Sequence, residues 1–172
     1  MAMRERHTMS VTIVTVPVIR FQERIIMEMK IMTPEARQKL KGLLVQHESY
    51  RQFPYSDTTG HLTVGIGRNL SDRGISTTEA VYLLDDDISY FTSKLNHFLP
   101  FFVKLDENRQ IALLDMCFNL GIQGFLNFTQ MIVALESGNY ELAAKEMLDS
   151  KWAQQVGERA TLLANIVRTG QL

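Results

Sequence analysis

Residues 47–67 read HESYRQFPYSDTTGHLTVGIG, and the change of pattern within this stretch decides the fold. Ahead of it, a helix start at Thr33-Pro34-Glu35 opens a run with apolar residues at helical spacing. Inside the stretch the apolar period drops to two, and a turn signal at Ser56–Gly60 separates two extended runs. The pattern therefore predicts a helix that leads into a β-hairpin over about residues 53–66.

Every strong signal after residue 76 is helical. Ser76 and Glu79 have the spacing of a capping box, and Asp106 and Asn139 are suited to cap later helices. The expected helices run from Ser76 to just before Pro100, from Asp106 to Gly121, through Met131–Leu135, through Ala143–Leu148 and from Arg159 to Arg168. We predict an α+β fold in two lobes, one small and built around the β-hairpin, the other mainly helical.

The composition is that of an ordinary globular domain. Of 172 residues, 45% are hydrophobic and 22% are charged, which argues against disorder. The formal net charge of −1 gives no electrostatic reason to expect nucleic acid or an anionic membrane as a partner. The single cysteine, Cys117, excludes an intramolecular disulfide. We expect residues 33–172 to form one domain and residues 1–32 to form an N-terminal extension of undetermined structure.

The extension contains one apolar stretch, Val11–Ile19. Nine residues are too few to span a bilayer, which takes about 20 in a helix. Basic residues precede the stretch as in a signal peptide, but no small-residue cleavage site follows, and Arg20 comes too soon. We therefore expect neither a signal peptide nor stable membrane insertion. A retained anchor or a contact arm is the alternative for this segment.

Two carboxylates in the deciding stretch have unlike surroundings. Glu48 comes at the end of the first helix, where we expect apolar neighbours to bury it in part, and Asp57 lies in the exposed turn. Glycoside hydrolysis needs one carboxyl group that stays protonated near neutral pH and a second that stays ionised. Taken singly, a glutamate at a helix end is more often simply solvated, and a turn aspartate more often only accepts from local backbone amides.

The spacing of Glu48, Asp57 nine residues later and Thr63 six residues after that, followed by Gly65-Ile66-Gly67, resembles the glycoside hydrolase family 24 lysozymes of the T-even phage type. Weaker matches follow in family order, so that the resemblance covers about residues 34–171. They are Asn119-Leu120-Gly121, Gly124-Phe125, Trp152 with Arg159, and Arg168-Thr169-Gly170. Arg68 departs from the pattern, because the best-known members have histidine there.

The resemblance implies a two-lobed lysozyme-like fold with a cleft between the lobes. It implies hydrolysis of the β-1,4 bond between N-acetylmuramic acid and N-acetylglucosamine in peptidoglycan. Glu48 would be the general acid, while Asp57 and Thr63 would stabilise the transition state and hold the attacking water, with inversion at the anomeric carbon.

The remaining site residues also come from the resemblance. Arg159 would orient Glu48, although a cation beside that carboxyl also favours its ionised form. Substrate-binding or orienting roles are expected for Asn119, Arg68 and Phe125. We expect no cofactor and no metal. The resemblance suggests a monomeric phage or prophage endolysin that accumulates in the host cytoplasm until it is released to the periplasm and the cell wall.

Two alternatives remain open at this point. A lytic transglycosylase needs only the glutamate and forms an anhydro product, and the presence of Asp57 and Thr63 argues against it. A non-catalytic cell-wall-binding protein could retain the fold, but the intact set of three residues argues against loss of catalysis.

Overall fold

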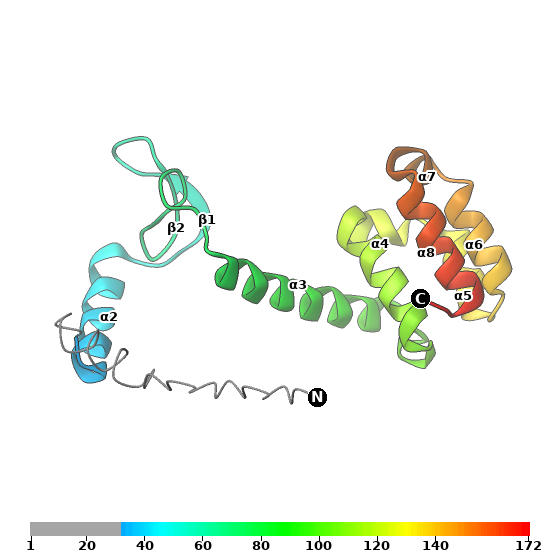
Figure 1. Ribbon diagram of the computed structural model, residues 1–172, viewed down its shortest axis with the longest axis horizontal. Coiled ribbons are helices and arrows are strands. Elements are labelled where there is room, and N and C mark those ends of the chain that lie inside the picture. The colour runs from blue at the N-terminus through cyan, green and yellow to red at the C-terminus, as the bar shows by residue number, and fades with distance from the viewer. Residues whose placement is uncertain (1–31) are drawn as a thin grey trace, which may run out of the picture. The chain divides into compact units, whose positions relative to one another are not determined.

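A computed structural model describes residues 32–172, which form parts of two compact units (Figure 1). The N-terminal unit ends at Gly74, and the C-terminal unit comprises Ile75–Leu172. The predictions for the apolar stretch Val11–Ile19 and for a signal peptide or anchor lie outside the described residues. The domain boundary after residue 32 stays a prediction.

Between residues 32 and 74, the N-terminal unit has one helix and a small sheet. Helix α2 spans Pro34–Glu48 and begins as predicted, because the Thr33 hydroxyl accepts a hydrogen bond from the Ala36 amide at 3.2 Å. The three antiparallel strands, in the order β1-β2-β3, are Arg51–Ser56, Leu62–Gly65 and Arg68–Asn69. The first two form the predicted hairpin. The two-residue β3 was not predicted, because so short a strand shows no periodicity.

The C-terminal unit is helical throughout its described length. Its helices are α3 (Thr77–Phe98), α4 (Glu107–Leu126), α5 (Thr129–Glu136), α6 (Tyr140–Leu148), α7 (Lys151–Val156) and α8 (Glu158–Thr169), with a short 3₁₀ turn at Phe102–Lys104. Ser76 and Glu79 form the predicted capping box, and Asp106 and Asn139 cap α4 and α6. The short α7 was not predicted. The predicted helix end at Gly121 is confirmed as a break in α4, where φ 69° and ψ 163° separate the helix that begins at Glu107 from a second helical segment that ends at Leu126.

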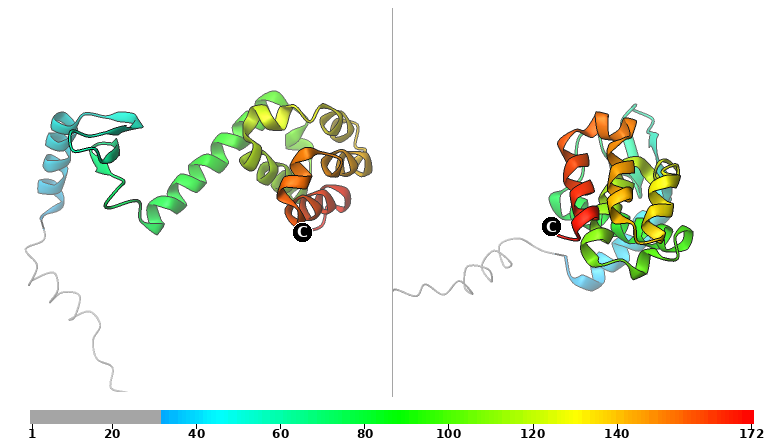
Figure 2. Two further views of the ribbon diagram at one scale, coloured as in Figure 1. Left: turned by 90° about the horizontal axis from the view of Figure 1, so that it is seen from above. Right: turned by 90° about the vertical axis from the view of Figure 1, so that its right-hand side faces the viewer.

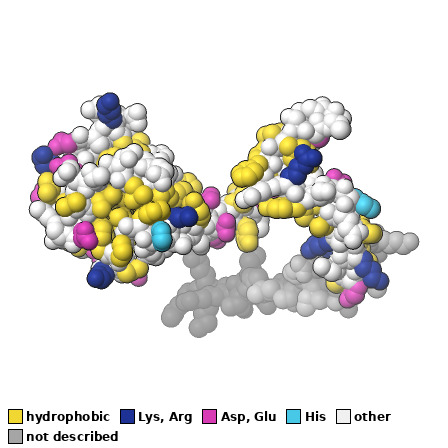
Figure 3. All heavy atoms as spheres, turned by 180° about the vertical axis from the view of Figure 1, so that it is seen from behind, with side chains coloured by type: hydrophobic (Ala, Val, Ile, Leu, Met, Phe, Trp, Pro, Cys, Tyr) yellow, Lys and Arg dark blue, Asp and Glu magenta, His cyan; other side chains and the backbone are white. Residues whose placement is uncertain are grey.

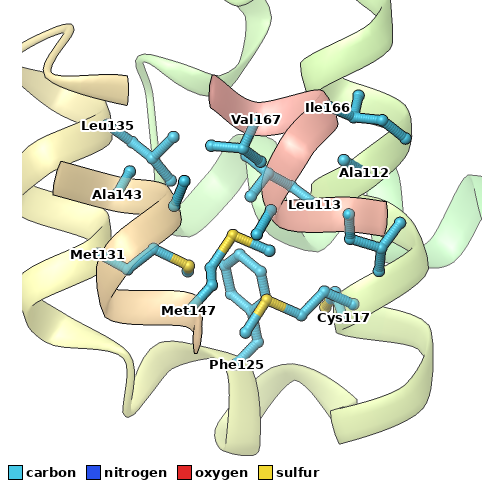
Figure 4. Packing of buried hydrophobic residues seen from close by; sticks show 14 of the residues in the cluster. Ala112, Leu113, Cys117, Phe125, Met131, Leu135, Ala143, Met147, Ile166 and Val167 are labelled. Carbon is cyan, nitrogen blue, oxygen red and sulfur yellow. The ribbon is translucent and has the colours of Figure 1, made fainter. Parts of the chain in front are cut away.

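The described hydrophobic core lies in the C-terminal unit. Helices α5, α6, α7 and α8 pack together around it, and α4 packs on α8 (Figure 2). The side chains of Phe125, Met131 and Met147 meet in the centre of this core (Figure 4). Cys117 is buried beside them, and burial raises the pKa of its thiol to about 11. A small sheet and a separate helical bundle confirm the predicted α+β class.

Two further features of the described residues are their exposed apolar surface and the length of their helices relative to a membrane span. Hydrophobic side chains gather on one face of the C-terminal unit (Figure 3). Within residues 32–172, no single helix is long and apolar enough to cross a membrane, and only the pair of α4 and α5, bent by 103°, meets that test by length and composition.

Candidate active site

Glu48 is the last residue of α2, and the residue after it has an unusual backbone conformation. Ser49 adopts φ 59° and ψ 159°, a conformation that is normally restricted to glycine, while its amide donates to the Val45 carbonyl at 3.2 Å. This conformation lies in the connection between α2 and β1. It costs about 1–3 kcal/mol of backbone strain at a serine.

The Glu48 side chain lies against the backbone of Gly67, just after β2. A Cβ atom built on Gly67 would lie 2.9 Å from Glu48 Oε2 and 3.2 Å from its Cδ, and Gly67 has a φ of +69°. A glycine at position 67 therefore serves two purposes, since it permits the positive φ and leaves room for the carboxylate.

The expected partial burial of Glu48 is wrong for its own unit. Glu48 is exposed, and α2 has no buried residue. Leu40 and Leu43, two apolar residues of the same helix, are themselves 40% and 51% exposed. Spacing along a helix predicts which side chains share a face, but it does not predict what covers that face.

Asp57 begins the turn between β1 and β2, and one of its oxygens accepts three hydrogen bonds. The donors to Oδ1 are the Thr59 amide at 2.8 Å, the Thr59 hydroxyl at 2.8 Å and the His61 amide at 2.9 Å. The bond from the Thr59 hydroxyl, followed by that from the His61 amide, holds the pKa of Asp57 below its ordinary value of 3.8. Asp57 is therefore ionised at neutral pH, as an anionic stabiliser must be.

Thr63 lies in the central strand, where it faces Tyr55 of β1 and Asn69 of β3. Only 4% of it is exposed, and its hydroxyl donates a long hydrogen bond of 3.4 Å to the His61 carbonyl. The hydroxyl oxygen keeps acceptor capacity for a water molecule. Glu48, Asp57 and Thr63 thus all belong to the N-terminal unit.

Arg68 belongs to the same unit, in β3. Its guanidinium donates to the Gly74 carbonyl at 3.1 Å, at the end of the loop that follows the sheet. Among residues 32–172, no group of three or more His, Cys, Asp or Glu side chains is arranged to hold a metal ion.

The other predicted site residues lie in the C-terminal unit. Arg159 of α8 donates through Nε to Asp115 Oδ1 of α4 at 2.8 Å, and both side chains are 41% exposed. This ion pair borders a groove of about 310 Å³ that six apolar side chains of α3 and α4 also line. Because Glu48 belongs to the other unit, the predicted pairing of Arg159 with Glu48 stays a prediction.

Asn119 and Phe125 have different surroundings. The exposed Asn119 accepts a hydrogen bond at its Oδ1 from the Trp152 indole at 2.8 Å, which leaves its amide hydrogens directed elsewhere. Phe125 is completely buried in the core. Its ring does not reach the surface, so any part that it plays in substrate binding is indirect, through the packing of α4.

Sequence reasoning missed several residues around the predicted ones. The Thr59 hydroxyl and the His61 imidazole both contact Asp57, and Asp115 holds Arg159. The turn sequence Asp57–His61 carried a usable signal, because a threonine two residues after a turn aspartate commonly donates to it. Asp115 gave none, since its partner is 44 residues away in the sequence.

A small sheet that carries an ionised aspartate follows a helix that ends in glutamate and precedes a helical bundle. Two carboxyl groups of this kind are what glycoside hydrolysis requires. The phage lysozyme family matches residues 45–168, which is most of the chain. The chain belongs to the phage lysozyme family, and it is a lysozyme-type peptidoglycan hydrolase.

Individual relatives are distant in sequence. Probable T4-type lysozyme 1 of Dictyostelium discoideum is 25% identical over 162 residues, which cover 77% of this chain and 95% of the relative. Probable T4-type lysozyme 2 of the same organism is 26% identical, with the same coverage of both chains. The pre-baseplate central spike protein Gp5 of Enterobacteria phage T4 is 27% identical over 158 residues, which cover 76% of this chain and 28% of that protein.

Proposed function

We propose that the enzyme is an N-acetylmuramidase, which hydrolyses the β-1,4 bond from N-acetylmuramic acid to N-acetylglucosamine. The observation that carries this proposal is the Asp57 carboxylate, which three hydrogen bonds keep ionised in the unit that also holds Glu48. An anion fixed in this way can stabilise the positive charge that develops on the sugar ring as the bond breaks.

Glu48 is the proposed general acid. It donates its proton to the glycosidic oxygen, so that the sugar leaves as an alcohol rather than as an alkoxide. The contact with Gly67 restricts where the carboxyl group can lie.

Asp57 and Thr63 are proposed to hold the attacking water. The carboxylate accepts one hydrogen of that water and the Thr63 hydroxyl takes part in a second hydrogen bond, so that the water attacks the face opposite the leaving group. This geometry inverts the anomeric carbon. Proton NMR of the first products should show the α-anomer, whereas an initial β-anomer would contradict the inverting mechanism.

The proposal assigns supporting roles to residues that do not react. Arg159, whose guanidinium Asp115 holds, keeps the orienting role that the family resemblance implies, and the Asn119 amide hydrogens donate to a sugar oxygen. Arg68 supports the site indirectly, because its hydrogen bond to the Gly74 carbonyl stabilises the loop that follows the sheet. We expect the enzyme to act as a monomer.

We also propose that the enzyme is an endolysin of a phage or prophage. It would accumulate in the host cytoplasm and reach the cell wall when the membrane is breached. Expression in Escherichia coli should leave the cells intact until chloroform or a holin permeabilises the inner membrane, and they should then lyse rapidly. Lysis without permeabilisation would contradict this localisation.

The central test compares wild type with Glu48→Gln and Asp57→Asn on permeabilised Gram-negative cells. Wild type should clear the suspension, and both variants should fold while losing at least about 100-fold in rate. A Glu48→Gln variant that lyses cells at the wild-type rate would refute the acid assignment. Anhydro-muropeptides in the digest would favour a lytic transglycosylase instead, and binding of peptidoglycan without cleavage would favour a non-catalytic protein.

A further inference from the structure

The His61 imidazole lies between two carboxylates at the end of the β-hairpin. Its Nδ1 atom is 2.8 Å from the Thr59 hydroxyl oxygen and 3.7 Å from Asp57 Oδ2. Its Nε2 atom is 3.6 Å from Asp72 Oδ2. Asp72 is in turn fixed by Asn69, whose side-chain amide donates to that carboxylate at 2.8 Å and accepts from the Asp72 amide at 2.9 Å.

These contacts determine which atom holds each proton. An ionised Asp57 can only accept hydrogen bonds, so the 2.8 Å contact from Thr59 uses the single hydroxyl hydrogen of that residue. The Thr59 oxygen must then accept in its contact with His61, and His61 carries a proton on Nδ1. The hydrogen bonds therefore run in one direction, from the imidazole through the hydroxyl to the carboxylate.

We propose that His61 is a positioning residue, which directs the Thr59 hydroxyl towards Asp57 and so fixes the catalytic orientation and ionised state of that carboxylate. The inference rests on the function proposed above only for its catalytic consequence. Without the imidazole, the Thr59 hydroxyl is free to rotate, because any nearby acceptor or water can take its hydrogen. The carboxylate then loses its strongest side-chain donor for part of the time.

The first test needs no substrate. NMR titration of the Asp57 carboxyl carbon should show a higher pKa in His61→Leu than in wild type, because the charged form has lost a hydrogen-bond donor. His61→Asn should restore the wild-type pKa, since the asparagine amide nitrogen occupies nearly the position of Nδ1 and also donates. An unchanged pKa in His61→Leu, or a His61→Asn variant that behaves like His61→Leu, would overturn the proposal.

A double-mutant cycle tests the route through Thr59. Thr59→Val removes the hydroxyl and keeps the side-chain shape, so His61→Leu should raise the pKa of Asp57 much less in that background than in wild type, with only the direct charge effect of His61 remaining. An equal additional rise would show that His61 acts on Asp57 directly and would refute the relay. His97→Leu, which removes an imidazole from α3, is the control for loss of a histidine and should leave the titration unchanged.

Kinetics then measure the catalytic consequence on peptidoglycan. In His61→Leu, kcat should fall about tenfold with KM unchanged, and the acid limb of the pH profile should move to higher pH. A wild-type profile in this variant would contradict a positioning role. Full activity in Glu48→Gln would instead refute the proposed function, and the NMR titration would still decide the role of His61.

Discussion

Replacing Gly67 with alanine should displace the Glu48 carboxylate and lower kcat. A matched control distinguishes this effect from a loss of stability. The added Cβ would lie 2.9 Å from Glu48 Oε2, whereas ordinary contact begins at 3.4 Å, so the carboxylate must move by about 0.5 Å. It can do so at little cost in stability, because it is the end of a flexible side chain. A misplacement of 1 Å costs about 100-fold in rate, which scales to about a tenfold fall in kcat for Gly67→Ala.

Gly65→Ala provides a matched control. Gly65 has a φ of +67°, close to the +69° of Gly67, but a Cβ at position 65 meets nothing within 4 Å. Both variants should lose about 1–2 kcal/mol of stability from the left-handed backbone. Only Gly67→Ala should lose activity.

The assays are urea unfolding, followed by circular dichroism, and initial rates of cell-wall clearing under conditions in which both variants are folded. Equal stability losses with a selective fall in kcat would support the contact between Gly67 and Glu48. Equal rates for the two variants would refute the reasoning, since the carboxylate would then not depend on the space at Gly67.

Three further predictions concern stability. Ser49→Gly should stabilise the protein by about 1 kcal/mol in urea titration, because glycine adopts φ 59° and ψ 159° without strain; a loss of stability would contradict this. The lowered pKa of Asp57 means that its ionised form stabilises the fold above pH 3.8 and that this contribution is lost as the pH falls through the folded pKa. Asp57→Asn should therefore be less stable than wild type at about pH 6 and approach it as the pH falls through the folded pKa, whereas a difference independent of pH would argue against the three hydrogen bonds. Gly170→Ala should lower stability by about 2 kcal/mol, since its Cβ would lie 2.7 Å from Arg109 Nη1, the guanidinium that also donates to the Val167 carbonyl at 2.7 Å; an unchanged melting temperature would show that Arg109 can move aside.

Local signals predicted most of the fold. Hydroxyl, carboxylate and amide caps at Ser76, Asp106 and Asn139 act over three residues, so sequence alone located the starts of three helices. The turn signal at Ser56–Gly60 likewise predicted the hairpin. The two-residue strand β3 and the six-residue helix α7 were missed, because each spans fewer than two full periods and so shows no repeat of its apolar pattern.

The candidate site was predicted less completely, because it depends on tertiary contacts. The spacing of Glu48, Asp57 and Thr63 was enough to nominate them. It did not show that Glu48 is exposed within its own unit or that Phe125 is fully buried. Contacts such as that between Asp115 and Arg159 join residues far apart in the sequence, and no local pattern encodes them.

The most direct test of the account is digestion of purified peptidoglycan in heavy-oxygen water, followed by mass spectrometry of the products. Water held by Asp57 and Thr63 should place one heavy oxygen atom on C1 of a newly formed N-acetylmuramic acid reducing end, and Glu48→Gln should abolish this labelling. Label on N-acetylglucosamine, or unlabelled anhydro ends, would contradict hydrolysis at the proposed bond by the proposed residues.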